Sequence, residues 1–304
     1  MQTSASELSD HAPAPRSPEV GPDTEVLWAE ITRLGLAPYV GQLEVCGFCV
    51  IPPDLATKSG MVNDLLAAIG KVHRRRFGAD IDLKGESEAS LKGKKGPLGG
   101  LMPYVLFEDP AFQAALLNPV ALALVTFMLG RNAILSSCQA SLKAAGKTEL
   151  MLHADNNGVS APFPAHYQIC NITYALTDYS HENGSICFVP GSHRLYRQPM
   201  PGETMDQRIA IAAPAGSIIA FSGNVWHGAF ARTAPGLRAN LLFQFARGHL
   251  SAFEAYRNNV SPELLAKHPP RFATLMGQHL GYGWTEAGPD RAYTPYDMGV
   301  HAYD

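Results

Sequence analysis

The second half of the chain is divided into short apolar segments separated by turn tripeptides, and this pattern limits the possible folds more than any other feature. Within many segments apolar and polar residues alternate, which is typical of half-buried strands. The segments cover residues 134–142, 166–176, 185–190, 209–212, 217–222 and 238–246. Glu-Asn-Gly, Pro-Gly-Ser and Pro-Ala-Gly lie among the connecting turns. The succession predicts a mainly β protein with flanking α-helices and a double-stranded β-helix, or jelly-roll, core.

Helical periodicity marks the region before these strands, where apolar residues recur every three or four positions. The predicted helices cover residues 24–35, 58–77, 110–117 and 119–129. A short apolar run after Gly47, stopped by Pro52 and Pro53, predicts a strand. Residues 78–100 gain glycine and charge and lose large apolar groups, so we expect a mobile surface loop there that could serve as a lid.

We predict one folded domain after a disordered leader. Residues 1–23 are rich in Pro, Ser and acidic groups and have little to bury. The domain, 24–304, comprises a helical part (24–132), the jelly-roll core (133–250) and a helix-and-loop extension (251–304). Large apolar residues of the extension either cap a pocket or form a satellite core. They are Phe253, Tyr256, Phe272, Leu275, Met276, Tyr282 and Trp284.

The charge balance narrows the classes of partner. Lys and Arg number 24 against 27 Asp and Glu, a net charge of −3, whereas proteins that track nucleic-acid phosphates carry a basic excess. The sequence begins without a basic and apolar leader, and its longest apolar run, 120–129, is too short to cross a bilayer. The five cysteines are expected to be reduced thiols. We therefore expect a cytoplasmic monomer or homodimer that acts on a small molecule and binds neither nucleic acid nor membrane.

One His-x-Asp tripeptide offers two metal-ligating side chains. Of the 11 histidines, only His153 has a carboxylate, Asp155, two positions later. Residues i and i+2 of an extended segment project to the same face, so this imidazole and this carboxylate can reach one ion. Taken alone, such a tripeptide is more often a surface turn.

His227 is the candidate for a second imidazole. It follows an apolar run, 215–226, which predicts a strand that starts at a tight turn and ends at His227. Two imidazoles and one carboxylate leave adjacent coordination positions open, as in non-haem Fe(II) oxygenases, whereas structural zinc prefers four protein ligands. The alternative is a buried histidine satisfied by backbone groups.

Arg238 opens the last predicted strand of the core. A turn at residues 234–237 would fold this strand back against the one that carries His227, which would bring the guanidinium to the metal pocket. A buried guanidinium needs a partner, and a dicarboxylic acid suits its planar fork. An ordinary buried salt bridge is the alternative.

In this order along the chain, the residues resemble the phytanoyl-CoA dioxygenase family of Fe(II)- and 2-oxoglutarate-dependent oxygenases. The resemblance rests on His153-Ala-Asp155, on residues 182–193 with their Asn-Gly and Val-Pro-Gly-Ser-His, on residues 213–221, and on His227 and Arg238. It spans about residues 40–250. It implies that His153, Asp155 and His227 hold Fe(II), that Arg238 binds the distal carboxylate of 2-oxoglutarate, and that dioxygen is the second cosubstrate.

The resemblance also implies contacts around the iron. Gln139 and Thr173 would lie against 2-oxoglutarate, and Asn171 shares the face of Thr173 on its strand. The substrate-facing candidates are Asn157, Phe163 and His166, although a plain surface loop is the alternative for their segment. Family members commonly carry a small hydroxyl residue two positions after the distal histidine, where this chain has Ala229, so one hydrogen bond to the cosubstrate is expected to be absent.

The resemblance implies oxidation of a C–H bond with release of succinate and carbon dioxide. We expect the reaction to be hydroxylation and the substrate to be a small hydrophobic metabolite of secondary metabolism. The carboxylate of Asp155 favours oxygenation over halogenation, because related halogenases have a small residue at that position. Two alternatives stay open. One is a jelly-roll protein that binds a small molecule without catalysis, and the other is an oxygenase of acyl-CoA, carrier-bound or peptide substrates.

Overall fold

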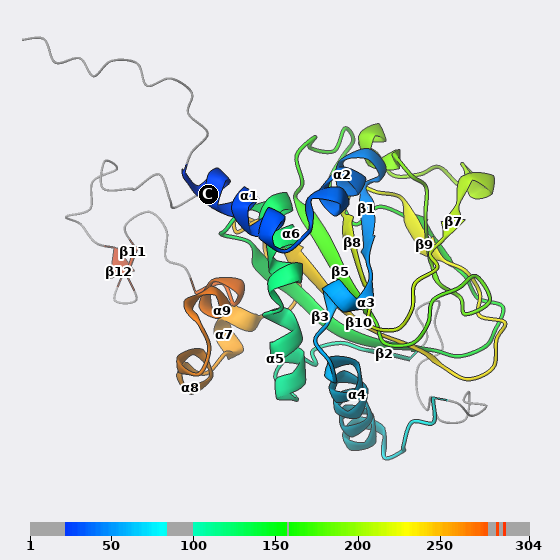
Figure 1. Ribbon diagram of the computed structural model, residues 1–304, viewed down its shortest axis with the longest axis horizontal. Helices are drawn as coiled ribbons and strands as arrows, with labels where there is room; N and C mark the ends of the chain where they lie inside the picture. Colours follow the sequence, from blue (N-terminus) through cyan, green and yellow to red (C-terminus); the bar gives the residue numbers. More distant parts are fainter. Residues whose placement is uncertain (1–21, 84–99, 157, 279–283, 286–287, 290–304) are drawn as a thin grey trace, which may run out of the picture.

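Two antiparallel sheets that face each other form the centre of the protein (Figure 1). The structure is a computed structural model that describes residues 22–83, 100–156, 158–278, 284–285 and 288–289. One sheet has six strands in the order β1-β8-β5-β10-β3-β2, and the other has four in the order β4-β9-β6-β7. This arrangement confirms the predicted jelly-roll core with flanking helices.

The helices lie mainly before and after the sheets in the sequence. They are α1 (Pro22–Arg33), α2 (Ala37–Cys46), α3 (Pro53–Ala56), α4 (Met61–Phe77), α5 (Pro110–Leu116), α6 (Pro119–Leu129), α7 (Tyr256–Asn259), α8 (Pro262–Ala266) and α9 (Pro270–Leu275). Two short 3-10 helices, η1 (Ser192–Leu195) and η2 (Met205–Gln207), lie between strands of the core.

The strands of the six-stranded sheet are β1 (Phe48–Ile51), β2 (Gly100–Met102), β3 (Ile134–Lys143), β5 (Ile169–Ala175), β8 (Ile218–Ser222) and β10 (Arg238–Ala246). Those of the four-stranded sheet are β4 (Leu150–His153), β6 (Ile186–Phe188), β7 (Ile209–Ala210) and β9 (His227–Ala229). A separate pair, β11 (Trp284–Thr285) and β12 (Gly288–Pro289), lies near the end of the chain.

The alternation of residue types along β10 gives the six-stranded sheet two different faces. Leu241 and Phe243 point into the main hydrophobic core, which also contains buried residues of α2, α4, α5 and α6. Asn240, Leu242 and Gln244 point the other way and line a cavity between the sheets. Because side chains of a strand alternate between faces, the same strand supports the helical layer and equips the cavity.

Helices α5 and α6 form part of the layer on one side of the strands (Figure 1). Each begins with a proline at its first position and a side-chain cap before it: the Asp109 Oδ1 accepts from the Ala111 N–H at 3.0 Å, and the Asn118 Oδ1 accepts from the Val120 N–H at 2.9 Å. Helix α6 is apolar on all sides, as expected of a helix packed within a protein.

Most predicted elements match the observed ones to within a few residues. Helix α1 begins at Pro22 rather than residue 24, and proline is favourable at that position because its φ suits a helix. Helix α4 begins at Met61 rather than residue 58, after Gly60 in the left-handed region. Residues 1–21 of the predicted leader and 84–99 of the predicted loop lie outside the described residues.

The Pro-Gly-Ser-His turn fixes the first strand against the core. The Ser192 hydroxyl donates to the Val189 carbonyl at 2.7 Å and accepts from the Trp226 N–H at 2.8 Å. His193 is buried against Gly47, at the junction of α2 and β1.

In the described ranges, no single helix is both long enough and apolar enough to cross a membrane. Helices α5 and α6 meet the length and composition criteria only when taken together, across a bend of 51°.

Candidate active site

Three predicted ligands converge in one cavity. His153 ends β4 and His227 begins β9, and the two residues are direct partners across these strands. Asp155 lies two residues beyond β4, where its N–H donates to the Gly223 carbonyl at 2.8 Å. One ligand atom from each residue lies within 4.8 Å of the other two. The spacing predicted from the sequence therefore brings two imidazoles and one carboxylate to a common point.

The carboxylate of Asp155 lies between the two rings. Its Oδ1 is 3.7 Å from the His153 Nε2, and its Oδ2 is 3.7 Å from the His227 Nε2. The Nδ1 of His153 lies 2.8 Å from the Met151 carbonyl, and that of His227 lies 3.0 Å from the Val225 carbonyl. Because a carbonyl only accepts, each Nδ1 donates a proton to it, and each Nε2 is the ring nitrogen nearest the Asp155 carboxylate.

The donor set fits a divalent transition metal. Burial lowers the pKa of His227 although the Asp155 carboxylate opposes the shift, and the neutral imidazole is the form that binds metals. The described residues place no fourth His, Cys, Asp or Glu in this group. Three protein ligands would leave the other coordination positions of the metal free, which suits non-haem iron better than structural zinc.

Asn171 orients the carboxylate ligand. Its side chain lies on β5 and is buried, and its Nδ2 donates to the Asp155 Oδ2 at 2.6 Å. The family resemblance placed Thr173 against the cosubstrate and the strand alternation added Asn171, and both residues line the cavity. The contact with Asp155 gives Asn171 a second task that the sequence pattern did not indicate.

Arg238 lies in the same cavity as the three ligands. Its Nη1 donates to the Gly184 carbonyl, its guanidinium carbon lies 5.0 Å from the centre of the Tyr179 ring, and its buried Nε has no partner. The predicted route to this position was wrong. Strand β8 ends at Ser222, His227 starts the separate strand β9, and β10 pairs with β3 and β5 rather than with β9. Arg238 therefore faces the histidines across the two sheets.

The cavity has a volume of about 240 Å³ and is lined by both polar and apolar residues. Its polar lining beyond the ligands includes Ser137, Gln139, Ser141, Thr173, Asn240 and Gln244. Its apolar lining includes Leu101, Leu150, Ile186, Phe221, Leu242 and Phe253. The predicted residues Gln139 and Thr173 thus line the cavity. The side-chain oxygen of Gln244, another lining residue, is buried without a hydrogen-bond partner.

The two substrate-facing candidates that the structure describes do not line this cavity. Phe163 is buried against Trp226 and Val189 in a small separate core, because its N–H is held by the Tyr196 carbonyl at 2.6 Å. His166 is exposed, and neither residue lines the cavity. Asn157 lies outside the described residues.

Several cavity residues escaped the sequence analysis although alternation along the strands could have found them. Asn240, Leu242 and Gln244 follow Arg238 at intervals of two on β10, and Ser137 and Ser141 flank Gln139 on β3. Residues that differ by two on a strand share a face, so a role for Arg238 and Gln139 in the cavity implies that their neighbours line it too.

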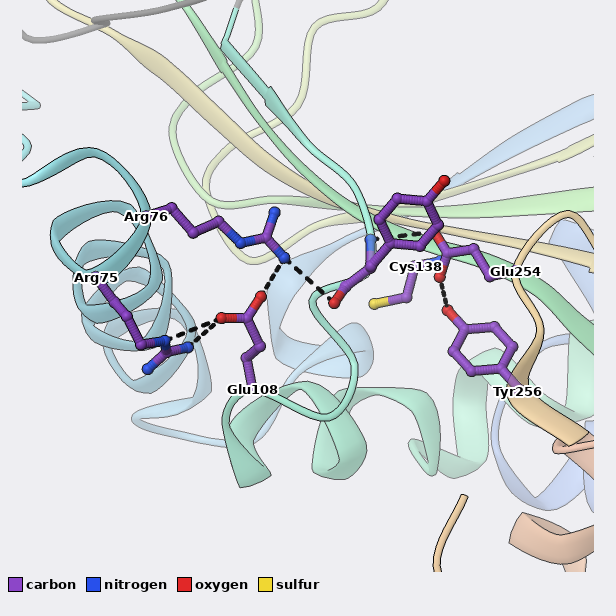
Figure 2. Close-up of polar contacts among 7 residues, drawn as sticks. Arg75, Arg76, Glu108, Cys138, Glu254 and Tyr256 are labelled. Carbon is purple, nitrogen blue, oxygen red and sulfur yellow. Dashed lines mark hydrogen bonds and ion pairs between the residues drawn. The ribbon is translucent and has the colours of Figure 1, made fainter. Parts of the chain in front are cut away.

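The sequence pattern could not distinguish Phe253 from the other apolar residues of the C-terminal extension, because its position depends on a buried carboxylate. The Glu254 side chain accepts from the Tyr104 and Cys138 N–H groups, both at 3.2 Å, and from the Tyr256 hydroxyl (Figure 2). The Phe253 N–H also donates to the Ser136 hydroxyl at 3.2 Å. These bonds hold the segment against β3, and the Phe253 ring, 65% exposed, stands at the cavity.

The same network continues to helix α4. Arg75 and Arg76 both pair with Glu108, and Arg76 also donates to the Tyr104 carbonyl at 3.3 Å (Figure 2). Arg75 and Arg76 are therefore tied to one acidic partner rather than free to bind an anion.

Comparison with known proteins gives a consistent result. Residues 43–240, more than half of the chain, match the profile described as Phytanoyl-CoA dioxygenase (PhyH). The dioxygenase af480 of Aspergillus fumigatus is 27% identical over 178 residues, which cover 57% of this chain and 57% of that protein. The match thus spans little more than half of this relative's length.

Solved structures share the fold at low identity. HygX from Streptomyces hygroscopicus, with nickel and 2-oxoglutarate bound, has a TM-score of 0.57 at 17% identity and covers 71% of this chain and 88% of its own. A further structure of HygX also has hygromycin B bound. SnoK, a non-haem α-ketoglutarate-dependent carbocyclase from nogalamycin biosynthesis, has a TM-score of 0.53 at 18% identity and covers 70% of this chain and 84% of its own.

Proposed function

The chain belongs to the phytanoyl-CoA dioxygenase family, and we propose that it is an Fe(II)- and 2-oxoglutarate-dependent dioxygenase that hydroxylates a C–H bond of a small hydrophobic metabolite. One observation carries the proposal. His153, Asp155 and His227 converge in a single cavity with Arg238, whose buried Nε has no partner. A protein that only binds a small molecule has no need of a metal triad together with a buried guanidinium that has a donor to spare.

Each residue has a defined task in this proposal. The two imidazoles and the carboxylate hold Fe(II) and leave adjacent positions free. Fe(II) and 2-oxoglutarate together supply dioxygen activation coupled to the release of succinate and carbon dioxide. Arg238 binds the distal carboxylate of 2-oxoglutarate, a charge-assisted contact in a buried site, and Asn171 keeps the Asp155 carboxylate in position.

The cavity lining supports a substrate with an extended apolar part. Leu101 and Phe253 come from segments outside the central strands and contribute apolar surface to the cavity, while Gln139 and Gln244 offer amides for hydrogen bonding. HygX binds hygromycin B and SnoK belongs to nogalamycin biosynthesis, so proteins of this fold do act on small molecules. We therefore place the substrate among the small metabolites rather than among peptides or acyl-CoA thioesters.

The experiment that tests the dioxygenase assignment is anaerobic reconstitution of the full chain with Fe(II) and 2-oxoglutarate. We expect a visible charge-transfer band, and, after admission of oxygen, slow formation of succinate without a primary substrate. The Asp155→Ala variant should lose both. Asp178→Ala is the matched control, because Asp178 is an exposed carboxylate that accepts only the Ala215 N–H outside the cavity.

Two results would contradict the dioxygenase assignment. One is the absence of the band and of succinate with the unaltered protein, and the other is succinate production by Asp155→Ala equal to that of Asp178→Ala. The substrate class is tested separately, by the increase in succinate that candidate metabolites, acyl-CoA thioesters and peptides produce. A response confined to acyl-CoA thioesters or peptides would refute the metabolite assignment and leave the dioxygenase assignment intact.

A further inference from the structure

A buried amide of β10 brings an unsatisfied acceptor to the cavity. Gln244 lines the cavity and is 9% exposed, and its side-chain oxygen has no hydrogen-bond partner among the described residues. Its cross-strand partners are Ser137 on β3 and Asn171 on β5. The Asn171 amide donates to Asp155 at 2.6 Å, and Ser137 accepts from the Gln139 amide at 3.3 Å. Because buried acceptors are normally satisfied, the Gln244 oxygen suits a donor on a molecule bound in the cavity.

Gln244 lies far along β10 from the residue assigned to the cosubstrate. Arg238 is six positions away on this strand, a separation of roughly 20 Å. Arg238 pairs with the last residue of β3, whereas Gln244 pairs with Asn171, whose amide holds the Asp155 carboxylate. The five-carbon chain of 2-oxoglutarate, with its distal carboxylate at Arg238, is too short to reach Gln244. This end of the cavity is therefore left to the primary substrate, next to a metal ligand.

A β-bulge brings an aromatic side chain to the same end. The pairing of β3 with β10 shifts directly after Gln244, so Ser136 is an extra residue without a partner on β10. Its carbonyl accepts from the Glu254 N–H at 2.9 Å, and its hydroxyl accepts from the Phe253 N–H at 3.2 Å. Bulges beside active sites commonly redirect a side chain or a segment. Here the bulge anchors the segment that carries Phe253 next to the strand position of Gln244.

The ring of Phe253 offers an apolar surface to a ligand. It lines the cavity and is nevertheless 65% exposed, while its backbone is held to β3 and Glu254 is tied to Tyr104 and Cys138 (Figure 2). An aromatic ring in a fixed position packs favourably against a second ring. One end of the cavity thus combines a flat apolar surface with a buried acceptor.

We propose that Gln244 and Phe253 form the subsite for the primary substrate, in which the Gln244 oxygen accepts a hydrogen bond from an O–H or N–H group of an apolar ring compound and Phe253 packs against its ring. The inference rests on the proposed function and narrows its substrate class. A purely hydrocarbon ring would leave the acceptor unsatisfied, so Gln244 selects for substrates that carry a donor.

The test measures ligand binding by the relaxation that Mn(II) induces in ligand protons, in the full chain loaded with Mn(II) and 2-oxoglutarate. The probes are two pairs of isomers that differ in the donor: 3-methylindole and 1-methylindole for N–H, and 4-ethylphenol and 4-methylanisole for O–H. In at least one pair we expect the isomer with the donor to bind about 10-fold more tightly, the effect of one hydrogen bond to a buried acceptor. A preference confined to one pair supports the subsite and identifies its donor.

Three variants separate the two contacts from a structural effect. Gln244→Met removes the acceptor and should reduce the preference to within about twofold, with unchanged 2-oxoglutarate affinity. Phe253→Ala should weaken both isomers about 3- to 10-fold and preserve the preference, because the ring acts on both alike. Gln42→Met, which replaces an exposed glutamine of α2, is the matched control and should change neither affinity. Gln244→Leu repeats the first change with a second apolar residue, which keeps the test valid even if the methionine variant folds poorly.

The outcomes distinguish this inference from the proposed function. Equal affinity for both isomers of each pair, failure of the unaltered protein to bind any of the four compounds, or a preference that survives in Gln244→Met and Gln244→Leu would overturn the subsite. A loss of 2-oxoglutarate affinity in both variants would assign Gln244 to the cosubstrate and overturn it too. Failure of the unaltered protein to bind Mn(II) or 2-oxoglutarate would instead refute the proposed function.

Discussion

Replacing Asn171 by leucine should weaken metal binding without disturbing the fold around it. The Asn171 Nδ2 donates to the Asp155 Oδ2 at 2.6 Å, and the side chain is 1% exposed, so water cannot take over the bond. A hydrogen bond to a charged group contributes about 1.5–3 kcal/mol, and each 1.4 kcal/mol corresponds to about a tenfold change in affinity. We therefore expect the affinity for Fe(II) or Mn(II) to fall by about 10- to 100-fold, the range typical of groups that orient metal ligands.

The measurement is an anaerobic metal titration of Asn171→Leu against a competing chelator. Thr173→Val is the matched control, because Thr173 lies on the same face of β5, is also buried and lines the cavity, and none of its observed contacts is with Asp155. Its metal affinity should remain within about threefold of the unaltered protein. Equal metal affinity in Asn171→Leu and the unaltered protein would refute the reasoning. A loss of 2-oxoglutarate affinity at saturating metal would add support for the predicted contact between Asn171 and the cosubstrate.

Three further predictions concern stability. Glu254→Ala leaves two buried backbone N–H groups without an acceptor, which should cost about 3 kcal/mol and lower the Tm by roughly 6 °C in calorimetry; a change under about 1 °C would contradict this. Burial raises the pKa of Glu254. The folded protein therefore gains stability from protonated Glu254; this gain is full below the ordinary carboxyl pKa and is lost as the pH rises through the raised pKa. Glu254→Gln should therefore flatten the dependence of the unfolding free energy on pH, and parallel curves in urea titrations from roughly pH 4 to pH 8 would count against this. Gly47→Ala should lower the free energy of unfolding by about 3 kcal/mol, because a Cβ there would lie 2.7 Å from the His193 Nδ1. Gly60→Ala is the control: Gly60 has the same φ of 87° but nothing within 4 Å of the added Cβ, so the loss should be only about 1 kcal/mol. Equal losses in urea unfolding would show that the close approach to His193 is unimportant.

Local patterns were sufficient for most of the elements and for grouping the candidate metal ligands. Helical periodicity predicted α5 and α6, and the structure shows why they begin where they do: a side-chain cap accepts a free N–H and a proline occupies the first position of each helix. The i, i+2 spacing of His153 and Asp155 put both side chains at one point, since extended backbone repeats every two residues.

Strand pairing was not accessible in the same way. The turn before Arg238 suggested a hairpin with the strand of His227, yet β10 lies between β3 and β5, and β9 lies between β4 and β6. Alternation along a strand fixes which residues share a face but carries no information on the neighbouring strand. For the same reason Phe163 was assigned to the substrate, although it packs against Trp226 in a core of its own.

The sequence by itself determined the donor chemistry of this protein: two imidazoles, a carboxylate and a guanidinium, on segments whose extended or turning character could be inferred from neighbouring residues. Only the tertiary structure decided what surrounds them. Glu254 meets the Tyr104 N–H across 150 positions of sequence, and Lys143 meets Arg238 because β3 and β10 are adjacent in the sheet. Such contacts arise when whole segments bury their apolar faces together, so no short stretch of sequence encodes them.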